Sequence, residues 1–232
     1  MSPTEQQAQR SVVSFVHRGR RMTAGQARAW ERHWARLGRE LTELPAGPLD
    51  LAGWFGRSAP VVLEIGSGMG ETTAQLAAAE PEVNYLAVEV YRPGLAQLMM
   101  RAEASGLTNL RLVRGDAVVL LDEHIAPGSL AEVRIFFPDP WPKKKHHKRR
   151  LIQPDFVGLV ATRLAPGGLL RLATDWEHYA VQMRDVCEAE PRLGNVYGGW
   201  APRPEWRRVT KFEGRARDAG RISRDLVFER RT

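Results

Sequence analysis

Acidic residues stand at the ends of five apolar segments of this chain. The segments span residues 61–66, 85–90, 110–116, 133–139 and 169–175, and each has the length and composition of a short strand. The acids at or near their ends are Glu64, Glu89, Asp116, Asp139 and Asp175. Carboxylates gathered at one edge of a sheet repel one another, so stability does not explain them. They predict a pocket for a ligand that carries positive charge.

A glycine turn follows the first of these segments, with Gly66, Gly68 and Gly70 at alternate positions. The dinucleotide-binding pattern would place its third glycine at position 71, where this chain has Glu71, and no Gly-Lys-Ser/Thr sequence follows. A pyrophosphate would also face Glu64 and Glu71 without a Lys or Arg in the loop. S-adenosylmethionine fits these residues better, because its sulfonium and ammonium groups are cations and its ribose and adenine donate hydrogen bonds.

Each acid then has an expected contact with this cofactor. Glu89 lies 23 residues beyond Gly66, close to the spacing of the ribose-binding acid in a nucleotide site. We expect Glu89 to accept hydrogen bonds from the ribose, Asp116 to bind the adenine end and Glu64 to lie under the methionine portion. The glycines would let the backbone approach the ligand.

The fourth segment continues into the sequence FFPDPWP, residues 136–142, which we call the acceptor loop. An acid and an aromatic residue between prolines form a stiff loop suited to a flat heterocycle. KKKHHKRR, residues 143–150, follows directly, and the six Lys and Arg of this basic run would bind a phosphate backbone. The alternative is a rigid turn beside a solvated run of charge.

These residues require a scaffold of alternating strands and helices. Residues 71–79, 93–105 and 154–164 have helical patterns between the apolar segments, which predicts parallel βαβ units. The expected fold is therefore a doubly wound, Rossmann-like α/β sheet, with its site at the carboxyl ends of the strands. Residues 225–231 and 206–212 are expected to form an antiparallel pair at the sheet edge.

The N-terminal part has a different pattern. Thr23 and Gln26 predict a capping box, and Trp30 and Trp34 lie on one face of the helix that follows. Prolines and a glycine at 45–48 end this helix. We therefore expect a basic arm with a docked helix over residues 1–50 and a methyltransferase domain over residues 51–232.

Composition and charge restrict the class of protein further. The chain has 232 residues, 43% of them hydrophobic, and no apolar run approaches the ~20 residues of a membrane span. A lone Cys187, a polar N-terminal start and the lack of spaced metal ligands predict a cytoplasmic protein without a bound metal. The net charge is +7, with excess Lys and Arg in residues 1–40, 143–150 and 203–232, so a polyanion is an expected partner.

Several separated motifs together resemble one family. PDPW followed by KKKHHKRR, with EIGSGMG at 64–70, ATDWEHYA at 173–180, TKFE at 210–213 and SFVHRGRRMTAGQ at 14–26, is similar to the bacterial tRNA (guanine-N7-)-methyltransferase family over nearly the whole chain. The resemblance implies transfer of a methyl group from S-adenosylmethionine to N7 of the variable-loop guanine (guanine-46) of tRNA. Pro142 departs from the family pattern, in which a His commonly follows the Trp, and we assign it no role.

The same resemblance implies functions for individual residues. Cofactor contacts are implied at Glu64, Glu89, Asp116 and Asp139. Substrate contacts are implied at Lys143, Asp175, Thr210, Lys211, Phe212 and Glu213. RNA contacts are implied at Lys145, His146, His147, Lys148, Arg149 and Arg150 of the basic run.

The chemistry of guanine N7 is consistent with this set of residues. N7 already offers a lone pair, so its methylation needs no general base. The enzyme must align donor and acceptor and place negative charge near the purine as it becomes cationic, and we expect Asp139 to supply that charge. Asp175 and Glu213 can accept hydrogen bonds from the guanine N1–H and amino groups, while Lys143 suits either a phosphate or a base edge.

Two other functions remain open from the sequence. An adenine amino-methyltransferase also uses an Asp-Pro-aromatic site, but its usual motif has both prolines before the aromatic residue, unlike Asp139-Pro140-Trp141. A non-catalytic RNA-binding module with a vestigial crevice is disfavoured by the intact set of strand-end acids. The oligomeric state, monomer or homodimer, is not decided by the sequence.

Overall fold

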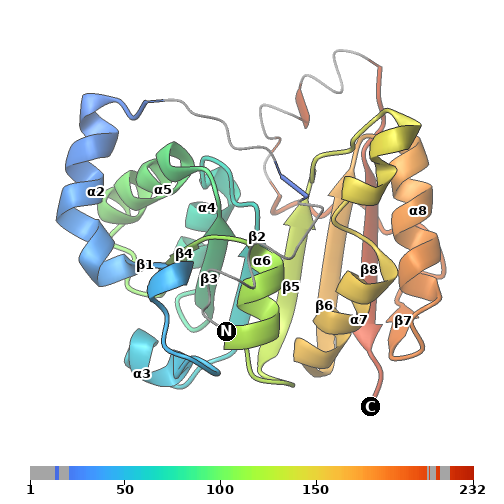
Figure 1. Ribbon diagram of the computed structural model, residues 1–232, viewed down its shortest axis with the longest axis horizontal. Coiled ribbons are helices and arrows are strands. Elements are labelled where there is room, and N and C mark those ends of the chain that lie inside the picture. The colour runs from blue at the N-terminus through green and yellow to red at the C-terminus, as the bar shows by residue number, and fades with distance from the viewer. Residues whose placement is uncertain (1–13, 16–20, 208, 210–212, 215–219) are drawn as a thin grey trace.

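A computed structural model describes residues 14–15, 21–207, 209, 213–214 and 220–232 (Figure 1). Over these ranges, eight strands form one sheet in the order β1-β4-β3-β2-β5-β6-β8-β7. The strands are β1 (Gly38–Glu40), β2 (Val61–Ile65), β3 (Asn84–Glu89), β4 (Leu110–Arg114), β5 (Leu130–Phe136), β6 (Leu164–Thr174), β7 (Leu193–Asn195) and β8 (Arg224–Arg230). Strands β1 to β6 pair in parallel, and β8 is antiparallel to both β6 and β7. This confirms the predicted mostly parallel sheet with an antiparallel C-terminal edge.

Helices cover both faces of the sheet because the central strands are apolar on both sides. Along β2, Val61, Leu63 and Ile65 belong to one apolar cluster and Val62 to the other. The helices α2 (Ala24–Leu37), α4 (Glu71–Ala79) and α5 (Arg92–Ala104) contribute to the cluster around Val62. The opposite cluster includes residues from α7 (Pro154–Arg163) and α8 (Glu177–Glu188). Shorter elements are η1 (Leu41–Glu43), α3 (Leu51–Phe55), α6 (Ala117–Val119), η2 (Leu120–His124) and η3 (Lys144–Arg149).

The N-terminal helix docks as its sequence predicts. Thr23 and Gln26 form both hydrogen bonds of a capping box at the start of α2. Trp30 is buried and stacks on Trp34 at 4.0 Å between ring centroids, and the Arg92 guanidinium of α5 lies 4.4 Å from the centre of the Trp30 ring. Strand β1 then joins the sheet beside β4. The division expected near residue 50 stays a prediction. Strand β1, which precedes it, pairs with β4, which follows it.

One predicted pairing is wrong. The last strand, β8, pairs with β6 and β7 and not with the described residues Trp206, Arg207 and Val209. Trp206 and Arg207 lie in a turn, where the Arg207 N–H donates to the Pro204 carbonyl oxygen at 3.2 Å. Residues 208 and 210–212 lie outside the described residues. The Arg207 side chain forms ion pairs with the buried carboxylates of Glu213 and Asp225, and these contacts hold the turn in place.

The order of the strands determines where a ligand can enter. From the centre of the sheet the chain moves from β2 to β3 and β4 in one direction, and from β5 to β6 in the other. Strands β2 and β5 are therefore neighbours whose following loops turn apart. Such a switch point opens a crevice at the carboxyl ends of the strands. The glycine turn and the acceptor loop border this crevice.

Candidate active site

The turn between β2 and α4 contains three glycines whose backbone adopts the left-handed conformation. Gly66, Gly68 and Gly70 have φ values of +78°, +56° and +70°, which residues with a Cβ rarely adopt. A Cβ at Gly66 or Gly68 would meet nothing within 4 Å, so the space beside the backbone is open there. The Oγ atom of Ser67, between them, is buried without a hydrogen-bond partner in the described part of the chain. Open backbone and a buried hydroxyl fit a polar ligand seated on this turn.

Glu89 fastens the glycine turn to the neighbouring strand. Its Oε2 accepts a hydrogen bond from the Gly68 N–H at 2.9 Å, and its Oε1 accepts from Val90 and Tyr91 at 2.7 and 2.9 Å. Burial raises the pKa of the Glu89 carboxyl, these three donors lower it, and the charge of Asp139 raises it further. Glu89 and Asp139 therefore lie close enough for their charges to interact. Oε2 accepts one bond from the described residues, and a carboxylate oxygen can accept a second from a ribose hydroxyl.

Glu64 lies beneath the turn, on the face of the sheet that α4 covers. Its side chain is buried, and its Oε2 accepts a hydrogen bond from the Thr73 hydroxyl of α4 at 2.7 Å. Burial is the main reason that the pKa of the Glu64 carboxyl is raised, and the Glu89 charge adds to the effect. A buried carboxylate that bonds only to a hydroxyl is costly to ionise. A cationic ligand above the turn would offset that cost.

The acceptor loop has a backbone that is unusual for its residue types. Phe137 and Trp141 have φ values of +52° and +44°, and they flank Asp139 on either side. Non-glycine residues in this region store strain, which recurs at functional sites. The Phe137 N–H donates to the Ala173 carbonyl oxygen at 2.8 Å, and the Trp141 Nε1–H donates to the Ser14 carbonyl oxygen at 3.2 Å. The loop is therefore shaped before any substrate binds.

The remaining strand-end acids lie at the same edge of the sheet. Asp116 follows β4 and caps α6, where its Oδ1 accepts from the Val118 N–H at 2.9 Å. Asp175 follows β6, and its Oδ2 accepts from the Arg221 Nε–H at 2.7 Å. The parallel strands thus bring all five predicted acids to one edge. Their individual contacts with cofactor or base remain predictions.

The basic run is joined to the acceptor loop through Trp141. The Arg149 guanidinium lies 4.9 Å from the centre of the Trp141 ring, and the His146 ring lies 5.8 Å from it. Desolvation and then the surrounding cations lower the pKa of His146, which disfavours the charged form of its ring. Other residues of the run are exposed to solvent, namely Lys143, Lys144, Lys145 and Lys148. Arg150 differs, because its side chain is buried. The RNA contacts predicted for the run stay predictions.

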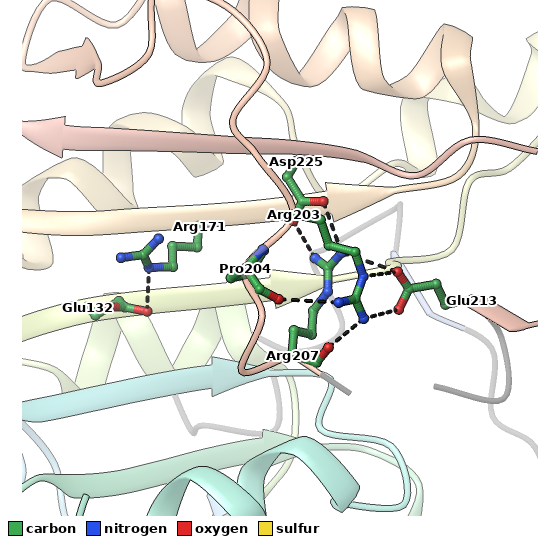
Figure 2. A network of polar contacts seen from close by, with 7 residues as sticks. All are labelled: Glu132, Arg171, Arg203, Pro204, Arg207, Glu213 and Asp225. Carbon is green, nitrogen blue, oxygen red and sulfur yellow. Dashed lines mark hydrogen bonds and ion pairs between the residues drawn. The ribbon is translucent and has the colours of Figure 1, made fainter. Parts of the chain in front are cut away.

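A buried ion network lies beside the acceptor loop (Figure 2). Glu213 is 1% exposed, and its carboxylate accepts from Arg203 Nε at 2.7 Å and Nη2 at 3.2 Å. Arg207 binds Asp225 through two hydrogen bonds, and its guanidinium lies 5.3 Å from the Phe137 ring centre. Sequence reasoning missed Arg203, Arg207 and Asp225, because nothing in their spacing indicates that they meet.

The network bears on the substrate contacts predicted for residues 210–213. Both oxygens of Glu213 already bond to arginine and the side chain is buried, so guanine would have to reach a carboxylate that the network encloses. Thr210, Lys211 and Phe212 lie outside the described residues. These contacts therefore stay predictions. Within the ranges described, no group of three or more His, Cys, Asp or Glu side chains could hold a metal, and no helix is long and apolar enough to span a membrane.

The fold agrees with solved methyltransferase structures. The 16S rRNA methyltransferase KamB superimposes with a TM-score of 0.52 at 14% identity, over 76% of this chain and 90% of that one. An rRNA methylase from Streptococcus thermophilus gives a TM-score of 0.52 at 15% identity, over 75% and 88% of the two chains. A family described as putative methyltransferase matches residues 58–226. Fold and site thus define a Rossmann-like methyltransferase that uses S-adenosylmethionine.

Full-length relatives identify the family more closely. The tRNA (guanine-N(7)-)-methyltransferase of Streptomyces coelicolor is 53% identical over 98% of this chain and 84% of its own length. Those of Bordetella pertussis and Alcanivorax borkumensis are 52% and 48% identical, over 94% and 99% of this chain and 85% and 95% of their own lengths. The chain belongs to the tRNA (guanine-N7-)-methyltransferase family.

Proposed function

We propose that this protein methylates N7 of the variable-loop guanine of tRNA in the cytoplasm. One observation carries the proposal: a strained loop bearing Asp139 borders the cofactor crevice and is joined through Trp141 to an exposed run of cations. The names of the relatives support the substrate, and a tRNA substrate supports the compartment. The oriented loop and the cations would place one base of a folded RNA at the crevice.

The cofactor half of the site follows from the residues of the glycine turn. When bound, S-adenosylmethionine supplies a methyl group on a positively charged sulfur. The turn and Glu89 would hold its ribose, Asp116 its adenine, and Glu64 the cationic methionine end. No side chain has to remove a proton, because N7 attacks with its own lone pair.

The acceptor half then has three tasks. Asp139 would place negative charge beside the purine, which gains positive charge as N7 is methylated. Its strained neighbours keep the carboxylate in position without reorganisation during the reaction. Lys143, Lys148 and Arg149 would bind phosphates, and Asp175 would accept hydrogen bonds from the guanine edge.

Asp139→Ala tests this assignment. With unmodified tRNA transcript and methyl-labelled donor, we expect the rate of transfer to fall by at least ~100-fold, the scale of one lost electrostatic contact in a transition state. The dissociation constant for tRNA should stay unchanged. Asp185→Asn removes the same charge from the exposed surface of α8 and serves as the control.

Nucleoside identification separates the candidate reactions. The proposal predicts 7-methylguanosine as the product of the wild-type protein. An N6-methyladenosine product would establish the adenine reaction instead, and binding without transfer would indicate an RNA-binding module. Wild-type turnover in Asp139→Ala would remove Asp139 from the mechanism.

A further inference from the structure

Arg150 ends the basic run but points away from solvent. Its side chain is 3% exposed, whereas Lys148 is exposed and Arg149 is half-buried over Trp141. A cation that binds a phosphate must reach the surface. The position of Arg150 therefore requires an explanation other than RNA binding.

The contacts of Arg150 join the acceptor loop to α8. Its Nε–H donates to the Pro140 carbonyl oxygen at 2.8 Å, directly after Asp139 in the chain. Its Nη1–H donates to Gln182 Oε1 at 2.6 Å, and its guanidinium lies 4.7 Å from the centre of the Tyr179 ring. Gln182 and Tyr179 both belong to α8. One side chain thus bridges the reacting loop and a helix packed on the sheet.

The α8 end of this bridge is itself fixed. The Gln182 Nε2–H donates to the Ile152 carbonyl oxygen at 3.0 Å, and the Tyr179 hydroxyl accepts from the Ile152 N–H at 3.1 Å. Tyr179 is fully buried in the core. The charge of Asp139 also acts on Tyr179, since it raises the pKa of that hydroxyl while Arg150 lowers it. Burial is the larger cause of the raised pKa of Tyr179. Arg150, Tyr179 and Asp139 therefore lie within one electrostatic neighbourhood.

Among the described residues, the acceptors that face the Arg150 guanidinium include no carboxylate. Besides Pro140 and Gln182, its guanidinium faces His147 Nε2 at 3.1 Å and His178 Nδ1 at 3.2 Å. Desolvation lowers the pKa of Arg150, but a guanidinium stays protonated in proteins. Burying a cation without a carboxylate partner costs free energy. The several directed donors of arginine, which a lysine cannot reproduce, explain why this residue occupies the position.

We propose that Arg150 is a positioning residue for methyl transfer, which clamps the Pro140 carbonyl, and with it Asp139, against α8. This inference rests on the proposed function and assigns Arg150 to catalysis through Asp139 rather than to RNA binding. A displaced acceptor loop would misplace the Asp139 charge and the guanine. Misplacement by about 1 Å can cost ~100-fold in rate.

Arg150→Gln and Arg149→Gln form the matched pair of variants. Both remove one positive charge from the same run. For Arg150→Gln we expect the single-turnover rate at saturating tRNA to fall by ~10- to 100-fold, with the tRNA dissociation constant within twofold of wild type and its salt dependence unchanged. For Arg149→Gln we expect a weaker tRNA complex and a salt slope smaller by about one phosphate contact.

Gln182→Leu tests the other end of the clamp. It breaks the bridge on α8 without changing charge, so it should lower the saturated rate and leave tRNA binding intact. Arg150→Lys keeps the charge but loses the fork, and its rate should resemble that of Arg150→Gln. Thermal unfolding identifies any variant that does not fold, and Gln182→Leu then decides the question.

Two outcomes would overturn the inference. In the first, Arg150→Gln weakens tRNA binding and reduces the salt slope, while its saturated rate stays normal. In the second, folded Arg150→Gln and Gln182→Leu both turn over like wild type. The wild-type reaction separates this test from the proposed function, because without 7-methylguanosine the proposed function itself fails.

Discussion

Arg207→Met removes the central cation of the buried network in Figure 2. The Arg207 side chain is fully buried, and its two Nη groups bond to the Asp225 oxygens at 2.5 and 2.9 Å. Met keeps most of the volume, so the lost charge dominates the effect. Breaking a buried pair from one side typically costs ~3–5 kcal/mol, because the remaining charge has no partner. We expect the free energy of unfolding at pH 7 to fall by about that amount.

The loss should depend on pH in a defined direction. Burial already raises the pKa of Asp225 above 3.8 despite the bonds from Arg207, and without Arg207 it will rise further. A carboxyl with a raised folded-state pKa favours folding when protonated and loses that contribution as the pH rises through the folded-state pKa. The deficit of Arg207→Met relative to wild type should therefore be smaller at pH 5 than at pH 8.

Urea unfolding followed by tryptophan fluorescence measures these free energies. Arg32→Met is the control, since the side chains of Arg32 and its partner Glu103 are 64% and 44% exposed; we expect little or no loss. Arg207→Met with Asp225→Leu replaces the pair by apolar groups and should recover most of the loss. The reasoning is refuted if Arg207→Met unfolds within 1 kcal/mol of wild type, or if the double variant is no more stable than the single one.

Two further predictions concern the cofactor crevice. Glu64→Gln removes a carboxyl whose pKa is raised above 4.5 by burial. The stability of the wild type should therefore fall relative to that of the variant as the pH rises through the raised pKa, by ~1.4 kcal/mol for each unit between the folded-state and unfolded-state pKa values. Urea unfolding measures both free energies as a function of pH, and parallel profiles would contradict the prediction. Gly94→Ala places a Cβ against the Gly68 carbonyl oxygen, and we expect a loss of ~1–3 kcal/mol in stability with weaker S-adenosylmethionine binding by calorimetry. Gly25→Ala, whose Cβ would make ordinary contacts, should leave binding unchanged, and equal affinities in the two alanine variants would count against the prediction.

The main elements could be predicted because local sequence determines them. Apolar runs between helical patterns indicate a parallel sheet, and glycines at alternate positions indicate a turn with positive φ. The capping box at Thr23 depends on residues three apart, so it is also readable from the chain. These features depend on residues that are close together in the sequence or that recur at a regular spacing.

Long-range packing accounts for what the sequence did not reveal. Arg149 and Arg150 are the same residue type, and only the contacts of Arg150 with Tyr179 and Gln182 in the folded chain distinguish the buried one. The segment from Trp206 was expected to form a strand, but Trp206 and Arg207 lie in a turn, where the Arg207 side chain forms ion pairs with Glu213 and Asp225. The edge strand β1 has only three residues, too few for a periodic signal.

The antiparallel direction of β8 gives the first and the later residues of this strand different roles. Because β8 is antiparallel to β6, Arg224 lies opposite Thr174, at the edge of the sheet that carries the strand-end acids. Each later residue of β8 lies farther from that edge. Its first residues supply Asp225 to the ion network, and the next, Leu226, Val227 and Phe228, are buried by packing alone. Tolerance to substitution should therefore change in character along seven residues, from a requirement for particular functional groups to a requirement for volume, and then to little requirement at Glu229.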